Sequence, residues 1–196
     1  MLARITARFF HPGSPLACRH KREPSEGRTI AWIGPVEIRL TRPCIVIETR
    51  VKGLRRDARA KGLRRIRDYA EGKNRTRCQV PLANHVMVQE ERSALFRVRM
   101  CVSDHQPSAL PAPLDPKVRM VEVPSEILAI RHVPRRLTPK VIASVEADLR
   151  LCLQGSRWIR DLTETLRLSE SARTLPFRPY GDLAFRVQED VRVRLT

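Results

Sequence analysis

Basic side chains are concentrated in a stretch that could bind an anion. Between residues 62 and 77 the sequence reads GLRRIRDYAEGKNRTR and contains only two acidic residues. Guanidinium groups donate paired, charge-assisted hydrogen bonds to carboxylates and phosphates. Arg64 and Arg65 in this stretch, and Arg59 just before it, are therefore candidates for contacts with an anionic ligand. The same residues also suit a helix face that contacts only water, and the sequence leaves both interpretations open.

The apolar residues of this region recur at the spacing of a helix. Small and apolar residues predict one stripe along residues 54–71, with Gly72 positioned to end the helix. Leu63 and Ile66 lie on the stripe. They could pack in the core, or they could contact a flat apolar ligand beside the helix.

Histidine and cysteine spacing indicates neither a zinc site nor a catalytic centre. No two of the five histidines have HxxxH spacing, and no cysteine pair forms a CxxC motif. The five cysteines are widely spaced and odd in number, which favours reduced thiols over a disulfide framework. No nucleophile–base arrangement can be identified, so we predict that the protein is not an enzyme.

The charge is strongly positive and uneven. The formal net charge is +17, and residues 1–80 hold 20 basic and 7 acidic residues, against 18 and 14 in residues 81–196. Such an excess favours an anionic partner: nucleic acid, a membrane surface or an anionic ligand. However, only 6 of the 38 basic residues are lysine, and an arginine bias of this kind can reflect genome composition alone.

The first 29 residues differ from the rest. They contain no acid before Glu23, three prolines and no long apolar run. We predict a disordered or targeting-like extension over residues 1–29 and a single domain over residues 30–196. The sequence contains no run of 18 apolar residues, so we expect no transmembrane segment. We expect a reducing, cytoplasmic setting, with organelle targeting by the extension as the alternative.

The remaining pattern predicts strands around two helices. Residues 36–51 indicate two strands around a turn at Arg42-Pro43, residues 94–102 alternate cleanly, and residues 117–123 and 127–133 indicate two more strands. Residues 78–89 indicate a further extended run and residues 185–196 a last strand or hairpin arm, while the pattern of residues 156–180 is ambiguous. Thr138 and Pro139 suit the start of a second helix over residues 139–153. No glycine-rich phosphate loop follows a strand. The order of elements predicts an α+β domain with an antiparallel sheet or open barrel.

Four segments, in order, resemble the SOUL haem-binding protein family. They are GPVEIRLTRPCIVIETRVKG, GLRRIRDYAEGKNRTR, LPAPLDPKVRMVEVPSEILAIRHV and LTPKVIASVEADLRLCL, and together they cover roughly residues 32–153. The resemblance implies two pseudo-symmetric β-α-β repeats in a distorted antiparallel β-barrel or sheet, flanked by two long helices. It also implies non-enzymatic binding of haem or a related tetrapyrrole, as a carrier or buffer, in a groove beside the first helix.

The resemblance implies a role for each candidate residue. Leu63 and Ile66 would face the porphyrin, and Arg59, Arg64 and Arg65 would pair with its propionates. His85 is a candidate axial ligand, although it stands where the family has a proline. Leu40 stands where some members carry a histidine proposed to bind iron. Whether iron is bound by the protein, and by which residue, therefore stays open; no separate metal site is expected.

Two other functions compete with tetrapyrrole binding. The basic N-terminal half could bind nucleic acid or another polyanion, but RNA-binding surfaces usually expose aromatic side chains, and only 5% of the residues are aromatic. Nucleic acid is therefore the less favoured partner. The fold class also resembles small-molecule effector-binding domains, a possibility that rests on fold analogy alone.

Overall fold

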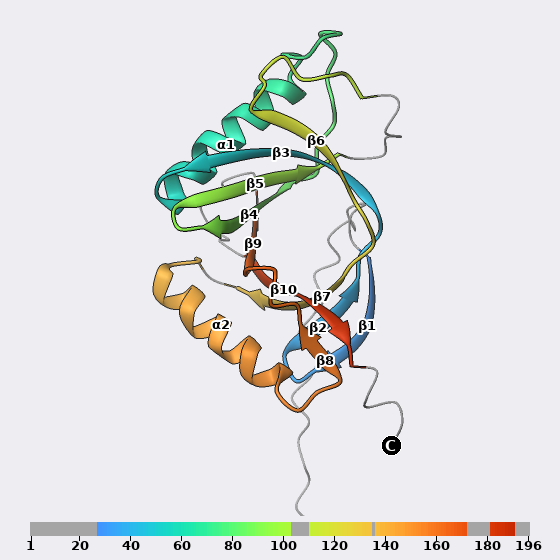
Figure 1. Cartoon of the computed structure of the whole chain (residues 1–196), viewed down its shortest axis with the longest axis vertical. Helices are drawn as coiled ribbons and strands as arrows, with labels where there is room; N and C mark the ends of the chain where they lie inside the picture. Colours follow the sequence, from blue (N-terminus) through green and yellow to red (C-terminus); the bar gives the residue numbers. More distant parts are fainter. Residues whose placement is uncertain (1–26, 103–109, 135, 172–180, 191–196) are drawn as a thin grey trace, which may run out of the picture.

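One antiparallel sheet and two helices form the described part of the chain. The computed structural model describes residues 27–102, 110–134, 136–171 and 181–190, which hold ten strands and two helices (Figure 1). The strands are β1 (Arg28–Ile33), β2 (Val36–Leu40), β3 (Cys44–Lys52), β4 (His85–Arg92), β5 (Leu95–Cys101), β6 (Val118–Val123), β7 (Ile127–Val133), β8 (Trp158–Arg160), β9 (Arg167–Ser171) and β10 (Gly181–Glu189). The helices are α1 (Arg55–Ala70) and α2 (Pro139–Leu153).

The sheet is open. Its strand order is β1-β2-β7-β10-β9-β4-β5-β3-β6, and β8 pairs with β10 outside this path. The two end strands, β1 and β6, do not pair with each other, so the sheet does not close into a barrel. This corrects the barrel part of the sequence prediction, whereas the α+β class is confirmed. The predicted pseudo-symmetry of two repeats stays a prediction.

Local sequence explains where both helices form. In α1 the buried residues are Ala58, Gly62, Leu63, Ile66 and Tyr69, which is the stripe that the sequence predicts. At the start of α2, the Thr138 hydroxyl accepts a hydrogen bond from the Val141 backbone amide at 3.3 Å, and a proline follows the cap. Both predicted helices are confirmed, α2 with the same bounds.

Alternation along the strands gives the sheet two distinct faces. On the face that we call the helix face, α1 covers β3 and β5, while α2 contacts β7, β8 and β10. Two large apolar clusters lie under these helices, one under each. Figure 1 shows both helices on the same side of the sheet, α1 beside β3 and α2 beside β10. The opposite face, which we call the open face, carries a small third cluster and most of the buried charges.

The strands differ from the prediction in two places. β1 includes Arg28 and Thr29, which the sequence analysis assigned to the N-terminal extension. The extended run predicted from residue 78 pairs as a strand only from His85, because the buried amide of Asn74 holds the preceding loop through the carbonyl oxygens of Tyr69 and Cys78.

The ambiguous region 156–180 contributes β8 and β9. The last strand is β10, which overlaps the strand predicted for residues 185–196. Residues 191–196 of that prediction lie outside the described residues, as do residues 1–26 of the predicted extension. Neither of the helices that the structure describes is long and apolar enough to cross a membrane.

Candidate functional site

The apolar stripe of α1 is used for packing. Leu63 is 7% exposed and Ile66 is fully buried, both within the cluster under α1. At Gly62 the helix approaches β5 so closely that an added Cβ would lie 2.6 Å from a methyl carbon of Val98. Leu63 and Ile66 therefore have the core-packing role that the sequence left open. They offer almost no surface to a porphyrin, because they already contact the sheet.

The three candidate arginines of α1 do not converge on one point. Arg59 pairs with Glu170 at 2.7 Å and donates a hydrogen bond to the Ser171 carbonyl oxygen at 2.9 Å. Arg65 points toward β3, where its guanidinium lies 3.3 Å from the Thr49 hydroxyl. Arg64 is exposed. Because Arg59 and Arg65 are held by different partners and Arg64 is exposed, a shared propionate site on this helix is unfavourable.

His85 lies on the face of the sheet opposite to α1. It lines a pocket on the open face together with Cys44, Met87 and Cys101, while its neighbour Val86 belongs to the cluster under α1. A ligand seated beside α1 would be separated from His85 by the sheet. The structure thus separates the candidate axial ligand from the candidate arginines.

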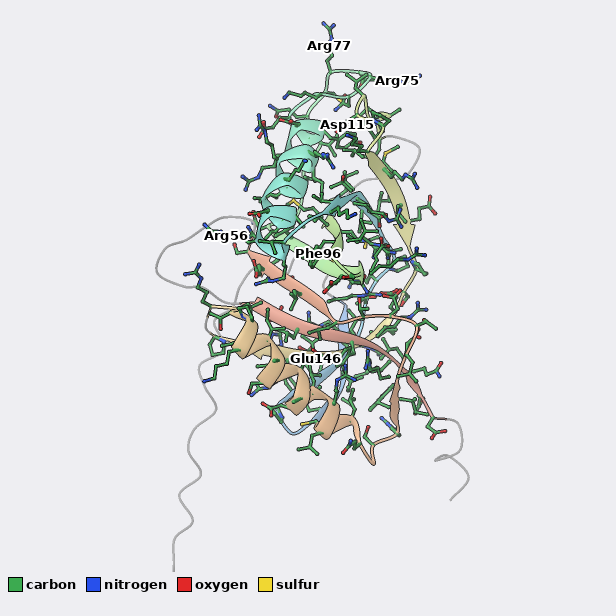
Figure 2. The ribbon with its side chains drawn as sticks, turned by 60° about the vertical axis from the view of Figure 1, so that its left-hand side comes forward. Arg56, Arg75, Arg77, Phe96, Asp115 and Glu146 are labelled. Atoms are coloured by element: carbon green, nitrogen blue, oxygen red, sulfur yellow. The ribbon has the colours of Figure 1, made fainter. Side chains whose placement is uncertain are left out.

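A different surface combines apolar side chains with cations. On the helix face, a cleft of about 440 Å³ runs between the start of α1 and the side of α2, and we call it the interhelical cleft. Figure 2 shows Phe96 on the α1 side and Glu146 on α2. The cleft is lined by Arg55, Val88, Glu90, Glu91, Arg92, Ser93, Phe96, Ile142, Glu146, Arg150, Arg160, Thr165, Leu166 and Leu168.

Two arginines meet at one end of the interhelical cleft. Arg150 from α2 and Arg160 from β8 both lie over the ring of buried Phe185, at 5.3 and 4.2 Å from its centroid. Glu146 pairs with Arg150 at 2.5 Å. Among the described residues no carboxylate pairs with Arg160, and its buried Nε has no hydrogen-bond partner. The cation–π contacts with Phe185 thus stabilise two guanidinium groups whose positive charges repel each other.

The electrostatics of Arg160 follow from this arrangement. Burial lowers the pKa of its guanidinium, and the neighbouring charge of Arg150 lowers it further, while Glu146 opposes the shift. The negative charge of a bound carboxylate would offset both the cost of burying Arg160 and its repulsion by Arg150. The end of the cleft therefore has the chemistry of an anion site.

The open face carries a second, smaller pocket of about 160 Å³. One side of it is fixed by a buried ion pair: Arg167 donates to the two carboxylate oxygens of Glu126 at 2.5 and 3.3 Å. Burial opposes the charge of Arg167, but hydrogen bonds and ion pairs with Glu126 and Glu164 raise its pKa. Cys44 and Cys101 lie in the same pocket, with their sulfur atoms 3.7 Å apart.

A histidine bridges three strands near this pocket. His132 in β7 contacts Asp182 in β10 at 2.7 Å and Glu37 in β2 at 3.0 Å. Hydrogen bonds to Asp182 and Glu37 raise the pKa of His132 to about 9, although burial opposes them. Burial also opposes the charge of Glu37, yet hydrogen bonds from His132, Arg39 and Thr29 hold its pKa well below the usual range. These groups form a structural network of opposite charges.

Comparison with known families identifies the chain. The sequence profile of the SOUL heme-binding protein family matches residues 29–174 of the 196 residues. The chain belongs to the SOUL heme-binding protein family. This match confirms the resemblance inferred from the four sequence segments. A comparison with curated protein sequences finds no match.

Solved structures share the fold at low sequence identity. The C-terminal domain of EcmrR is similar with a TM-score of 0.58 and 11% identity, over 79% of this chain and 97% of that domain. A hydrolase from Listeria innocua is similar with a TM-score of 0.56 and 8% identity, over 81% of this chain and 94% of that protein. EcmrR in a DNA complex gives 0.59 and 11%, over 79% of this chain and 57% of that one. These likenesses establish the fold alone.

Sequence reasoning missed the interhelical cleft. Ile142, Glu146 and Arg150 recur every four residues, which places them on one face of α2. That spacing was a usable signal. Arg160 and Leu166 lie in the segment whose pattern was ambiguous, and only the pairing of β8 with β10 brings Arg160 beside Arg150.

Proposed function

We propose that this SOUL family protein binds haem or a related tetrapyrrole in the interhelical cleft, as a non-catalytic carrier or buffer. The observation that carries the proposal is that Arg150 and Arg160 both lie over Phe185 in a cleft that combines charged and apolar side chains, in a chain of this family. The cleft begins at Arg55, the first residue of α1. It therefore keeps the expected place beside the first helix but uses different side chains.

The size and lining of the cleft suit a flat, amphiphilic ligand. Its volume of about 440 Å³ falls in the range of small-molecule sites. Val88, Phe96, Ile142, Leu166 and Leu168 supply the apolar surface. Since Val88 and Leu168 are buried side chains of paired strands, this floor is rigid. A rigid apolar floor favours a planar ring over a flexible chain.

The cations of the cleft account for propionate binding. Arg160 has a buried Nε without a partner among the described residues, so a ligand carboxylate would supply a hydrogen bond that is missing. Arg92 lines the cleft at the β4–β5 turn and is exposed. Two carboxylates on one ligand edge could contact the Arg150–Arg160 pair together, which would reduce the repulsion between these arginines.

Iron coordination is not needed for this mode of binding. The described residues that line the cleft include no histidine, cysteine or methionine, which are the usual protein ligands of haem iron. Affinity would come from the ring surface and the carboxylates, both of which hemin and protoporphyrin IX share. We therefore expect the two compounds to bind with similar affinity.

The test is a titration of the purified full chain with hemin and with protoporphyrin IX, followed by absorbance and by tryptophan fluorescence. Trp158 is a suitable reporter because it lies in β8, the strand that carries Arg160. Loss of one charge-assisted hydrogen bond costs about 1.5 kcal/mol or more. Arg160→Gln should therefore weaken the binding of both compounds by about tenfold.

A matched control separates the cleft from the outer face of α1. Arg64→Gln removes the same charge from an exposed residue that the sequence favoured, and it should leave both affinities unchanged. Ile142→Asp, at the edge of the cleft, should weaken both. If Arg64→Gln weakens binding while Arg160→Gln and Ile142→Asp do not, the site lies on α1 and the cleft proposal fails. Absence of saturable binding of either compound would reject tetrapyrrole binding itself.

A second candidate function has one specific observation in its favour. Exposed basic side chains follow the outer side of α1 and the turn after it, and Figure 2 shows Arg56, Arg75 and Arg77 pointing away from the protein. This surface could bind nucleic acid or another polyanion. Binding to unrelated nucleic acids with a steep dependence on salt would support this function, and no binding at low salt would reject it.

A further inference from the structure

Two cysteines that are far apart in the sequence meet on the open face. Cys44 is the first residue of β3 and Cys101 the last residue of β5, and the two strands pair with Val46 opposite Cys101. Their sulfur atoms are 3.7 Å apart. A disulfide needs about 2.05 Å between sulfur atoms. Because both residues lie at strand ends, a small rotation of the side chains and a slight shift of the ends would suffice.

The surroundings favour reaction at Cys44. Cys44 is half-buried and Cys101 is 7% exposed, and both line the open-face pocket of about 160 Å³. A pocket of this size has room for a small molecule such as a peroxide. Arg99 also lines it, and its charge favours the Cys44 thiolate, although the carboxylate of Glu126 in the same pocket opposes it. The thiolate is the reactive form of a cysteine.

The thiols also interact with each other directly. The hydrogen bond with Cys101 lowers the pKa of the Cys44 thiol, burial and the charge of Glu126 oppose this, and Arg99 supports it. This direction agrees with the geometry, in which Cys101 is the more buried of the two thiols and Cys44 the more accessible. A nucleophilic thiol with a second thiol in reach is the arrangement of a reversible redox pair.

We propose that Cys44 and Cys101 form a redox modification site that hydroperoxides convert into an intramolecular disulfide. The Cys44 thiolate attacks one peroxide oxygen and the O–O bond breaks. With hydrogen peroxide, the leaving hydroxide takes up a proton to give water, and Cys44 becomes a sulfenic acid. The Cys101 thiol then attacks the Cys44 sulfur, the S–O bond breaks, and a second water leaves with the thiol proton. Two electrons pass from the thiols to the peroxide.

The pair is independent of tetrapyrrole binding. Cys44 and Cys101 lie on the open face, while the interhelical cleft lies on the helix face. Disulfide formation would change the open-face pocket, since both sulfur atoms contribute to its wall. The redox proposal can therefore fail or succeed without affecting the function proposed above.

The experiment treats the full chain with a stoichiometric amount of hydrogen peroxide, blocks the remaining thiols, and measures the intact mass and the non-reduced peptide map. The expected result is a loss of two hydrogen atoms, a linked peptide pair containing Cys44 and Cys101, and recovery of both thiols with a dithiol reductant. Cys101→Ser should instead accumulate a sulfenic acid at Cys44 that a dione reagent traps.

The other described cysteines provide the controls. Cys78 is exposed and Cys152 is partly buried, and Cys78→Ser or Cys152→Ser should leave the Cys44–Cys101 link intact. The link is measured in the protein without substitutions, so the result does not depend on whether a variant folds. If oxidation occurs at Cys78 while Cys44 and Cys101 can still be blocked, or if a different pair is linked, the proposal is wrong.

Discussion

Gly62→Ala tests how α1 is seated on the sheet. An added Cβ would lie 2.6 Å from Val98 Cγ2 and 2.7 Å from Val98 Cβ, well inside van der Waals contact. Val98 is fully buried and β-branched, so it cannot rotate away cheaply. Overpacking of this kind costs about 1–3 kcal/mol, whereas replacing glycine by alanine inside a helix contributes about 1 kcal/mol. We expect a net loss of up to about 2 kcal/mol in the free energy of unfolding.

The assay is urea unfolding followed by far-ultraviolet circular dichroism. Ala60→Gly is the matched control: Ala60 lies in α1 and is exposed, so this change should cost about 1 kcal/mol through helix propensity alone. In a Val98→Gly background, which removes the Cβ as well as both methyl groups, the clash is relieved, and Gly62→Ala should then be neutral or stabilising by up to about 1 kcal/mol relative to that background. If Gly62→Ala alone stabilises the protein, the close approach of α1 to β5 is not a constraint and the reasoning is refuted.

Three further predictions concern the two faces of the sheet. Arg167→Met leaves the buried carboxylate of Glu126 without its main partner and should cost about 3–5 kcal/mol in urea unfolding, while adding Glu126→Gln should recover part of the loss. Because the folded-state pKa of His132 is raised to about 9, its stabilising charge is fully present below its usual pKa and is lost as the pH rises through 9. His132→Asn should therefore cost about 1 kcal/mol near pH 6, a modest value because the side chain is 46% exposed, and the difference from the unmodified protein should vanish near pH 10. Leu149→Ala, at a fully buried position of α2, should cost about 2–5 kcal/mol, and an unchanged unfolding midpoint would show that α2 is not part of the core.

The assignment of the binding surface depends on which face of the sheet each side chain occupies. The α1 residues favoured by sequence are divided among three roles: Leu63 and Ile66 pack in the core, Arg59 pairs with Glu170 on β9, and Arg64 is exposed. The interhelical cleft uses α2 and β8 instead. This difference explains why Arg160→Gln and Arg64→Gln together decide between the two surfaces.

The sequence by itself determined the local elements and the family. Both helices could be predicted because an apolar stripe with a period of 3.6 residues, and a cap such as Thr138, are properties of consecutive residues. Most of the strands from β2 to β7 could be predicted in the same way from alternation. Family membership also followed from the sequence, because four short segments kept their order and spacing.

Only the tertiary structure decided which distant residues share a site. Cys44 and Cys101 are 57 residues apart, and they meet because β3 pairs with β5 in one register. Arg150 and Arg160 meet over Phe185 because β8 pairs with β10 beneath α2. Alternation along a strand predicts that its side chains divide between two faces, but not which strand lies next to it or what covers each face. The neighbours of each strand and the helices that cover each face are set by the packing of the whole sheet. This packing placed His85 on the face opposite to α1.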